Sequence, residues 1–132
     1  DIIGGGGSDI FQYGSGEAFT NVNSSSVFET ISDFTTNSDK IGVVGVTVSE
    51  LTYFEGFETV SSGFDDKVVD SGILGFDGTG NDAFLMYNVA GTGVGYLAID
   101  MDGDGSLDSD GDIVLLLSNV DEAADLVFTD FT

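Results

Sequence analysis

The charge imbalance is the feature that most constrains how this chain can fold. Its 132 residues carry 24 acidic side chains against two basic ones, Lys40 and Lys67, which gives a net charge of −22. Such a surplus repels itself when the chain becomes compact, and two internal cations are too few to offset it. Because carboxylate oxygens prefer hard cations, we expect the neutralising charge to come from bound metal ions.

The rest of the composition narrows the function classes. The chain has the size of one domain, and a hydrophobic content of 41%, with 11 Phe and 4 Tyr, supplies a core. The lack of a basic patch argues against binding to nucleic acid or to an anionic membrane surface. The sequence has no Cys and no His, which excludes disulfides, thiolate metal sites and imidazole bases. We expect no enzyme and no membrane insertion.

Short runs of β-branched and aromatic residues, separated by Gly, Asp and Ser turns, predict an all-β fold. We expect one domain over residues 1–132, with a glycine-rich first zone (1–41), a β-rich second zone (42–75) and a third zone (76–132) that holds an aspartate-rich segment. Helical periodicity is weak, with single turns possible at 48–51 and 121–125. The expected strands cover residues 10–13, 43–44, 46–48, 51–60, 67–69, 83–89, 94–99 and 113–117.

Residues 100–111, with the sequence DMDGDGSLDSDG, form the strongest metal-binding motif. They match the D-x-D-x-D-G opening of a calcium loop, in which aspartates at alternate positions direct oxygens toward one centre. Gly111 stands where the usual bidentate Glu would be, so Asp110 or Asp112 would have to complete the ligand set. Because no helix is predicted on either side, we expect a calcium loop between two strands; the alternative is a solvated acidic hairpin. The candidate ligands are Asp100, Asp102, Asp104, Ser106, Asp108, Asp110 and Asp112.

A glycine repeat occupies residues 4–12, with the sequence GGGGSDIFQ, and residues 77–85 (DGTGNDAFL) form a second copy with Asp in the first position. Both resemble the calcium-binding nonapeptide of RTX (repeats-in-toxin) proteins. Glycines can leave carbonyls pointing into a turn, an Asp adds a charged oxygen, and Phe11 would point inward. A flexible linker or an ordinary tight turn is the alternative. The resemblance implies a further set of calcium ligands: Gly5, Gly7, Asp9, Asp77, Gly78, Gly80 and Asp82.

Further segments resemble the C-terminal regions of serralysin-type RTX proteins. Residues 26–34 (SVFETISDF) followed by 39–41 (DKI) are similar to the family pattern D-x-I-x-D-F … D-K-I, with Glu29 in place of Asp. Residues 96–100, 112–117, 123–125 and 130–132 are similar to the ends of type I-secreted calcium-binding proteins, whereas residues 42–75 lie outside the resemblance. It implies export by a type I secretion apparatus and folding on calcium outside the cell. The opening residues look like the middle of a larger pattern, so we expect a fragment or a processed product.

Together these features predict a short β-roll edge that continues into a β-sandwich-like module, with a calcium loop between strands. We expect a secreted, calcium-binding structural module that self-assembles into a surface layer, fibre or matrix. One alternative is the secretion and folding tail of a larger toxin, protease or adhesin. Another is a calcium-dependent carbohydrate-binding domain of an adhesin.

The N-terminal repeat also predicts self-association. Residues 4–9 make one complete turn with only a remnant of an earlier repeat before it, so the turn is half of a calcium site beside an open strand edge at residues 10–13. A second copy that fills it head to tail would propagate into a filament or lattice. We expect Lys40 and Lys67 to form surface ion pairs with their sequence neighbours Asp39 and Asp66.

Overall fold

The computed structural model describes residues 1–14, 29–45, 53–55, 83–87, 93–105, 112–120 and 125–132. These ranges form β-strands joined by turns, together with a short 3-10 helix, η2 (Phe128–Asp130). The predicted all-β class is therefore confirmed for the part of the chain that the structure describes. No helix in these ranges has the length and apolar character needed to cross a membrane.

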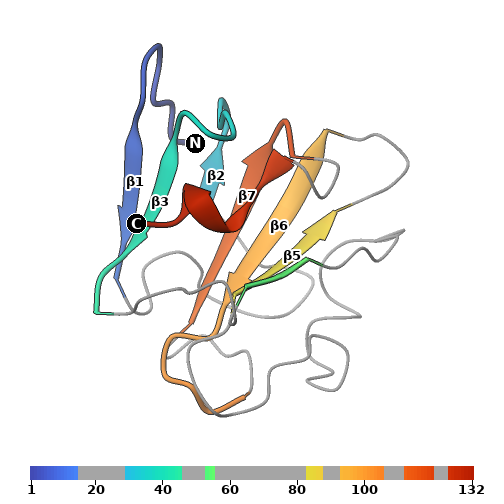
Figure 1. Cartoon of the computed structure of the whole chain (residues 1–132). Helices are drawn as coiled ribbons and strands as arrows, with labels where there is room; N and C mark the ends of the chain where they lie inside the picture. The colour runs from blue at the N-terminus through green and yellow to red at the C-terminus, as the bar shows by residue number, and fades with distance from the viewer. Residues whose placement is uncertain (15–28, 46–52, 56–82, 88–92, 106–111, 121–124) are drawn as a thin grey trace.

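The larger of two sheets has five strands. Its spatial order is β2 (Glu29–Ile31), β7 (Ile113–Ser118), β6 (Val94–Ile99), β5 (Ala83–Tyr87) and β4 (Tyr53–Glu55). The three central strands are antiparallel, whereas β2 and β4 run parallel to their neighbours at the two sides. Figure 1 shows β6 and β7 side by side in the middle of the molecule. Both are rich in branched apolar residues, which suits buried strand positions.

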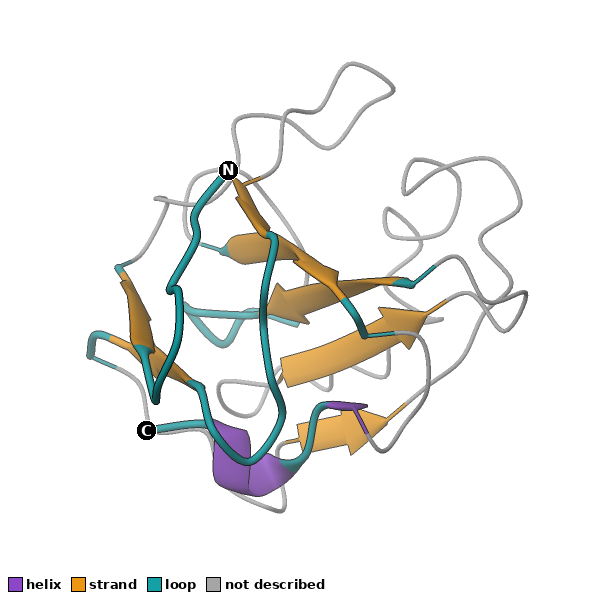
Figure 2. Ribbon diagram, turned by 90° about the horizontal axis from the view of Figure 1, so that it is seen from above, coloured by secondary structure: helices purple, strands orange, loops and turns teal. Residues whose placement is uncertain are grey.

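The smaller sheet pairs β1 (Ile10–Tyr13) with β3 (Lys40–Val43) in parallel. Just before β1, Ile2 forms a parallel bridge with Ile31 at the end of β2. Residues 2–13 and 31–43 thus run side by side in the same direction, each as an extended stretch, a turn and a second extended stretch. Figure 2 shows the two sheets from above, with the C-terminus close to the smaller one.

One hydrophobic core joins the two sheets. In β1, Phe11 and Tyr13 are buried while Ile10 and Gln12 point outward, as the two-residue period of a strand requires. The ring centroids of Phe11 and Phe34 lie 6.5 Å apart. Burying one large apolar side chain stabilises a fold by about 1.5–3 kcal/mol, so this cluster is the main stabilising term. Its members are Phe11, Tyr13, Ile31, Phe34, Ile41, Val43, Leu97, Ile99, Met101, Ile113, Leu115, Leu117, Val120 and Leu126.

The last residues complete the smaller sheet. Phe131 forms a parallel bridge with Ile41, and the Thr132 N–H donates to the Ile41 carbonyl at 3.0 Å. The side of β3 that faces away from β1 is therefore covered by the chain's own C-terminal residues. This placement leaves β1 as the outer strand of the smaller sheet.

Most strand predictions agree with the structure where it can be compared, but β2 (Glu29–Ile31) was not predicted and Val44 lies in a turn. Residues 94–99 are a strand as expected, and the strand expected at 113–117 extends by one residue to Ser118. The strand expected at 43–44 begins earlier, at Lys40, because its apolar face continues onto Phe11 and Tyr13 through the pairing with β1. The expected strands at 46–48 and 67–69 and the helical turn at 48–51 lie outside the described residues, as does most of the turn at 121–125.

Candidate metal centre

The acidic loop, residues 100–112, joins two neighbouring antiparallel strands. Ile99 at the end of β6 pairs with Ile113 at the start of β7. The next residues outward, Asp100 and Asp112, therefore leave the sheet at the same place, although they lie twelve positions apart in the sequence. The strand pairing itself brings both carboxylates together.

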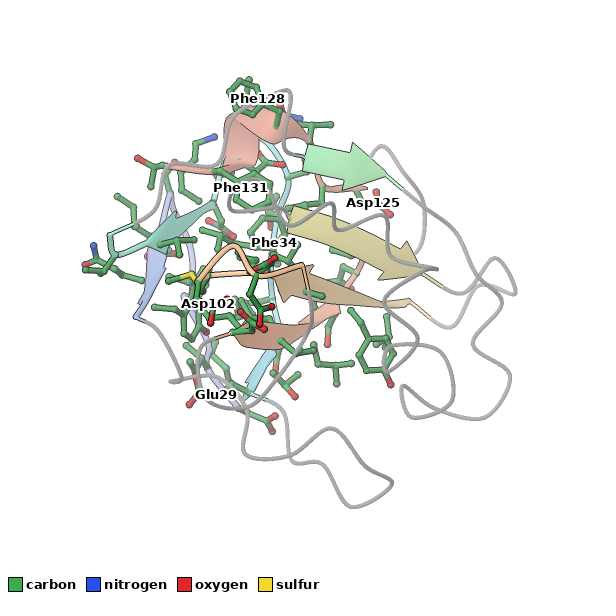
Figure 3. All side chains as sticks on the ribbon, turned by 90° about the horizontal axis from the view of Figure 1, so that it is seen from below. Glu29, Phe34, Asp102, Asp125, Phe128 and Phe131 are labelled. Carbon is green, nitrogen blue, oxygen red and sulfur yellow. The ribbon has the colours of Figure 1, made fainter. Side chains whose placement is uncertain are left out.

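Three carboxylates converge at this place. One oxygen each from Asp100, Asp102 and Asp112 lies within 4.8 Å of the other two. Asp100 and Asp112 are fully buried, at 0% and 1% exposure, whereas Asp102 is exposed. Figure 3 labels Asp102 on the loop that leaves β6. A small cation would reach all three from the solvent side, past Asp102.

Backbone hydrogen bonds hold the first half of the loop in shape. The two carboxylate oxygens of Asp100 accept from the N–H groups of Gly103, at 2.6 Å, and Gly105, at 2.9 Å. Both glycines have positive φ, 75° and 82°, which explains why the turn needs residues without a Cβ. Asp112 Oδ1 accepts from the Met101 N–H at 2.8 Å. The carboxylates are thus oriented before any ion arrives.

The electrostatics of the cluster favour a bound cation. Burial raises the pKa of Asp100 above its usual range, against the two glycine N–H bonds that lower it, and the charges of Asp102 and Asp104 raise it further. Buried like charges at this spacing destabilise a fold unless a positive charge lies among them. The donors are oxygens only, which fits a hard ion such as Ca²⁺ or Mg²⁺ better than a transition metal. The described residues can therefore hold a metal ion.

The structure brings together only part of the predicted ligand set. Asp100, Asp102 and Asp112 converge, whereas Asp104 is exposed and lies outside the cluster. The Asp104 N–H instead donates to Asp102 Oδ1 at 3.1 Å. Several predicted ligands lie outside the described residues: Ser106, Asp108, Asp110, Asp77, Gly78, Gly80 and Asp82.

The predicted glycine turn is present, and a second turn lies against it. We call residues 4–9 and 32–39 together the turn pair. Asp33 of the second turn accepts from the N–H groups of Gly4, at 3.0 Å, and Gly5, at 2.8 Å. These two hydrogen bonds lower the pKa of Asp33 below its usual 3.8, and the bond from Gly5 has the larger effect. The turn's donors are therefore satisfied by a protein carboxylate.

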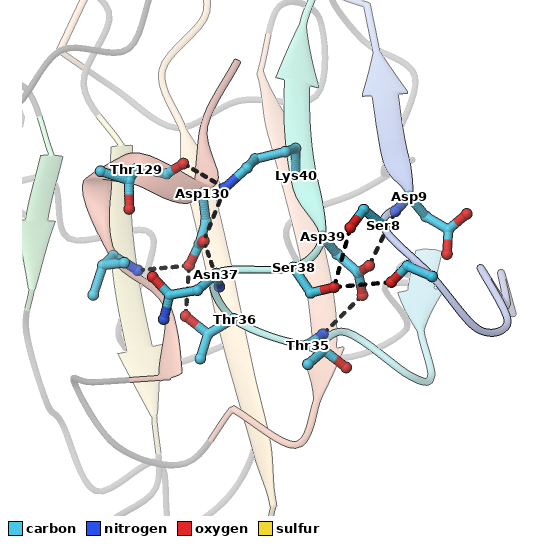
Figure 4. Close-up of polar contacts among 12 residues, drawn as sticks. Ser8, Asp9, Thr35, Thr36, Asn37, Ser38, Asp39, Lys40, Thr129 and Asp130 are labelled. Carbon is cyan, nitrogen blue, oxygen red and sulfur yellow. Dashed lines mark hydrogen bonds and ion pairs between the residues drawn. The ribbon is translucent and has the colours of Figure 1, made fainter.

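A second carboxylate ties the other end of the turn pair, as Figure 4 shows. Asp39 is buried and accepts from the N–H groups of Asp9, at 3.1 Å, and Thr35, at 2.9 Å. The Ser38 hydroxyl donates to the Gly7 carbonyl at 2.8 Å. One carbonyl that the RTX resemblance assigned to calcium thus accepts a hydrogen bond from a side chain.

One carboxylate oxygen of the predicted ligand Asp9 is buried and closely packed. Its Oδ2 is buried without a hydrogen-bond partner among the described residues, and a Cβ added at Gly4 would come within 2.7 Å of it. Gly4 is therefore required by the close approach of this carboxylate. Gly5 and Gly7 are exposed, with φ of 89° and 131°. In the part of the chain that can be described, Asp9 belongs to no cluster of three carboxylates.

Asp130 accepts hydrogen bonds from several parts of the chain, and its contacts correct one expectation. It is fully buried and accepts from Thr36 Oγ1 at 2.7 Å and from the N–H groups of Asn37 and Val127. Lys40 Nζ lies 3.5 Å from Asp130 Oδ1 and donates to the Thr129 carbonyl at 2.7 Å. The expected pair of Lys40 with Asp39 is wrong, because the Asp39 carboxylate accepts from backbone N–H groups. Lys67 lies outside the described residues.

Sequence reasoning missed the hydrogen bonds that Asp33, Asp39 and Asp130 accept. The first two lie in the stretch 26–41 that carries the family resemblance, which marked the segment but not its contacts. Asp130 lies ninety residues from Lys40. No local pattern reports a contact at that separation.

No protein-family model matches this sequence, and no curated protein matches it either.

Proposed function

We propose that this chain is a calcium-binding, extracellular structural β module, in which the ion joins β6 to β7 through the acidic loop. The convergence of Asp100, Asp102 and Asp112, two of them fully buried, carries the proposal. An ion there would neutralise charges that otherwise oppose the closure of the central strand pair.

Calcium is the hard cation that suits this loop best. It accepts six to eight oxygen ligands in flexible geometry, whereas magnesium requires a near-ideal octahedron and retains several waters. The described carboxylates supply part of such a shell, and Asp108 and Asp110 lie in the same loop sequence. Calcium is also abundant outside cells, where sites of modest affinity fill.

The turn pair supports the secreted, RTX-like part of the proposal. Residues 2–13 and 31–43 lie in parallel register through the Ile2–Ile31 bridge and the β1–β3 pairing, as consecutive turns of a β-roll edge would. Together with the RTX-like motifs, this favours export by a type I apparatus and folding on calcium outside the cell. The module would bind its ion for structure and would carry out no catalysis.

A calcium titration with two matched variants tests the proposal. Asp102→Asn and Asp104→Asn each remove one charge from the same loop, but only Asp102 belongs to the cluster. We expect the parent to bind calcium with Kd on the order of 10⁻⁴ to 10⁻³ M. Asp102→Asn should weaken binding about tenfold or more, and Asp104→Asn clearly less.

Calorimetry measures the affinity, and hydrogen exchange locates the effect. Calcium should slow amide exchange in β6 and β7, since their connecting loop closes on the ion. Equal affinities of the two variants would show that the ion does not bind at the described cluster. Identical exchange with calcium and with chelator would contradict the function.

A further inference from the structure

The outer edge of β1 carries unpaired backbone groups. The carbonyls of Asp9 and Tyr13 accept from the N–H groups of Lys40 and Val44, each at 2.8 Å. In a parallel ladder alternate residues face the same neighbour, so the N–H and C=O groups of Ile10 and Gln12 point away from β3. Among the described strands only β3 pairs with β1. Figure 1 shows β1 at the outer side of the molecule.

A hollow runs along this edge. It has a volume of about 450 Å³ and is lined by Ile2, Ile10, Phe11, Gln12, Tyr13 and Glu29. All four residues of β1 contribute to it, although their side chains alternate between the two faces of the sheet. Only a hollow along the strand edge can be lined from both faces. The Tyr13 hydroxyl is buried there and has no hydrogen-bond partner among the described residues.

The edge lacks the features that usually prevent pairing. Exposed edge strands are commonly protected by Lys, by inward-pointing charges or by Pro. The four residues of β1 are Ile, Phe, Gln and Tyr, and the side chain of Ile10 is 64% exposed. The next residues with charge are Asp9 before the strand and Glu29 at the rim of the hollow.

A second copy of this chain is the partner that fits best. A basic protein would be drawn to the acidic surface of a molecule with a net charge of −22, and not to its uncharged strand. Two copies repel each other elsewhere, but across β1 they meet without direct contact between like charges. An uncharged, unpaired strand is also self-complementary, as a two-fold interface requires.

We propose that β1 pairs antiparallel with β1 of a second copy about a two-fold axis near Phe11. Ile10 then lies opposite Gln12 of the other copy, and each such pair exchanges both backbone hydrogen bonds. The other side of β3 is covered by Phe131, so within the described part of the chain the smaller sheet offers one open edge and the contact closes at a dimer. This differs from the head-to-tail filament that the sequence predicts. It does not require that the ion in the acidic loop is calcium.

Sedimentation of the parent and two variants tests the dimer. Ile10→Glu places a charge on the edge, and Phe128→Glu places the same charge at an exposed apolar residue of η2, away from β1. We expect a concentration-dependent dimer of the parent up to about 1 mM chain, and a Kd weakened about tenfold or more by Ile10→Glu only. Each sample is measured in calcium and in chelator with about 0.5 M NaCl, which screens repulsion without a divalent ion.

Hydrogen exchange of the parent gives a second readout that depends on no variant. The amides of Ile10 and Gln12 should become protected as the chain concentration rises, while those of Phe11 and Tyr13 change little because they face β3. A parent that stays monomeric, concentration-independent exchange at Ile10 and Gln12, or equal dimerisation of both variants would overturn the proposal. Large open-ended assemblies would overturn it in favour of the filament. Dimerisation in both solutions without calcium binding would refute the proposed function alone.

Discussion

The turn pair and the acidic loop differ in how their aspartate carboxylates are arranged. Both place aspartates at turns between strands of a chain that has a large excess of negative charge. Asp33 and Asp39 of the turn pair, and Asp130 of η2 beside it, each accept from at least two protein donors. In the acidic loop, Asp100 and Asp112 also accept backbone bonds, but their oxygens converge with that of Asp102. In the first region each carboxylate has its own protein donors, whereas in the second three carboxylates converge.

The difference shows that the number of acidic residues does not identify a metal site. Asp39 and Asp130 are buried, as many metal ligands are. Their oxygens, however, accept hydrogen bonds from separate protein donors. Asp100 and Asp112 become a candidate site because two paired strands end beside each other and direct both carboxylates to one place. Convergence and burial together distinguish the two regions.

The largest expected effect comes from Asp130, which accepts hydrogen bonds from the second turn of the turn pair. Asp130→Ala leaves the Thr36 hydroxyl and the N–H groups of Asn37 and Val127 without this buried acceptor and removes the ion-pair partner of Lys40. Removing one partner from such a network costs about 3–5 kcal/mol of the free energy of unfolding. Urea unfolding should show the same loss in calcium and in chelator, since no ion is involved. A loss that appears only in calcium would erase the distinction between the regions.

A smaller effect, with a change of sign, is expected in the acidic loop. Asp112→Asn keeps an oxygen that can accept from the Met101 N–H but removes one of three clustered charges. In chelator this should stabilise the fold by about 1 kcal/mol, because like-charge repulsion falls. In calcium the variant should be less stable than the parent, because ion binding is weakened. Paired urea titrations measure both values, and a variant that destabilises equally in both solutions would show that the cluster needs no cation.

The smallest expected effect concerns Tyr13, which lies near the turn pair. Its pKa is shifted chiefly by burial and not by a cluster of carboxylates. Burial, and to a lesser degree the charge of Glu29, raise the pKa of Tyr13 to about 12. The folded chain therefore keeps the phenol neutral while an unfolded chain ionises near pH 10, so stability present below pH 10 is lost as the pH rises toward 12. The parent should lose on the order of 1 kcal/mol more than Tyr13→Phe over this range.

This pH effect is measured by urea unfolding of dilute, monomeric samples, with phenolate absorbance as the second readout. The pH effect should be the same in calcium and in chelator, because Tyr13 does not belong to the carboxylate cluster of the acidic loop. Parallel pH profiles of parent and Tyr13→Phe would show that Tyr13 titrates as an exposed tyrosine.

Local patterns in the sequence were enough to predict the strand class and the position of the loop. Val94 to Ile99 and Ile113 to Leu117 are apolar runs of strand length with an aspartate-rich stretch between them, and such runs form strands wherever they are buried. The D-x-D-x-D-G spacing identified Asp100 and Asp102, and the missing Glu left Asp110 or Asp112 to complete the ligand set. Glycines at 103 and 105 marked the turn, since their positive φ is a local requirement.

Contacts between distant segments could be read from the tertiary structure alone. The parallel pairing of β1 with β3, the bridge from Ile2 to Ile31, and the contact of Lys40 with Asp130 depend on how the whole core is buried. Tertiary packing also places Asp112 within the carboxylate cluster and Asp104 outside it. Composition and spacing report residue types along the chain, whereas the direction of a carboxylate is set by the register of paired strands. The sequence therefore determined the chemistry available to this protein, and the packing of its two sheets determined which carboxylates converge.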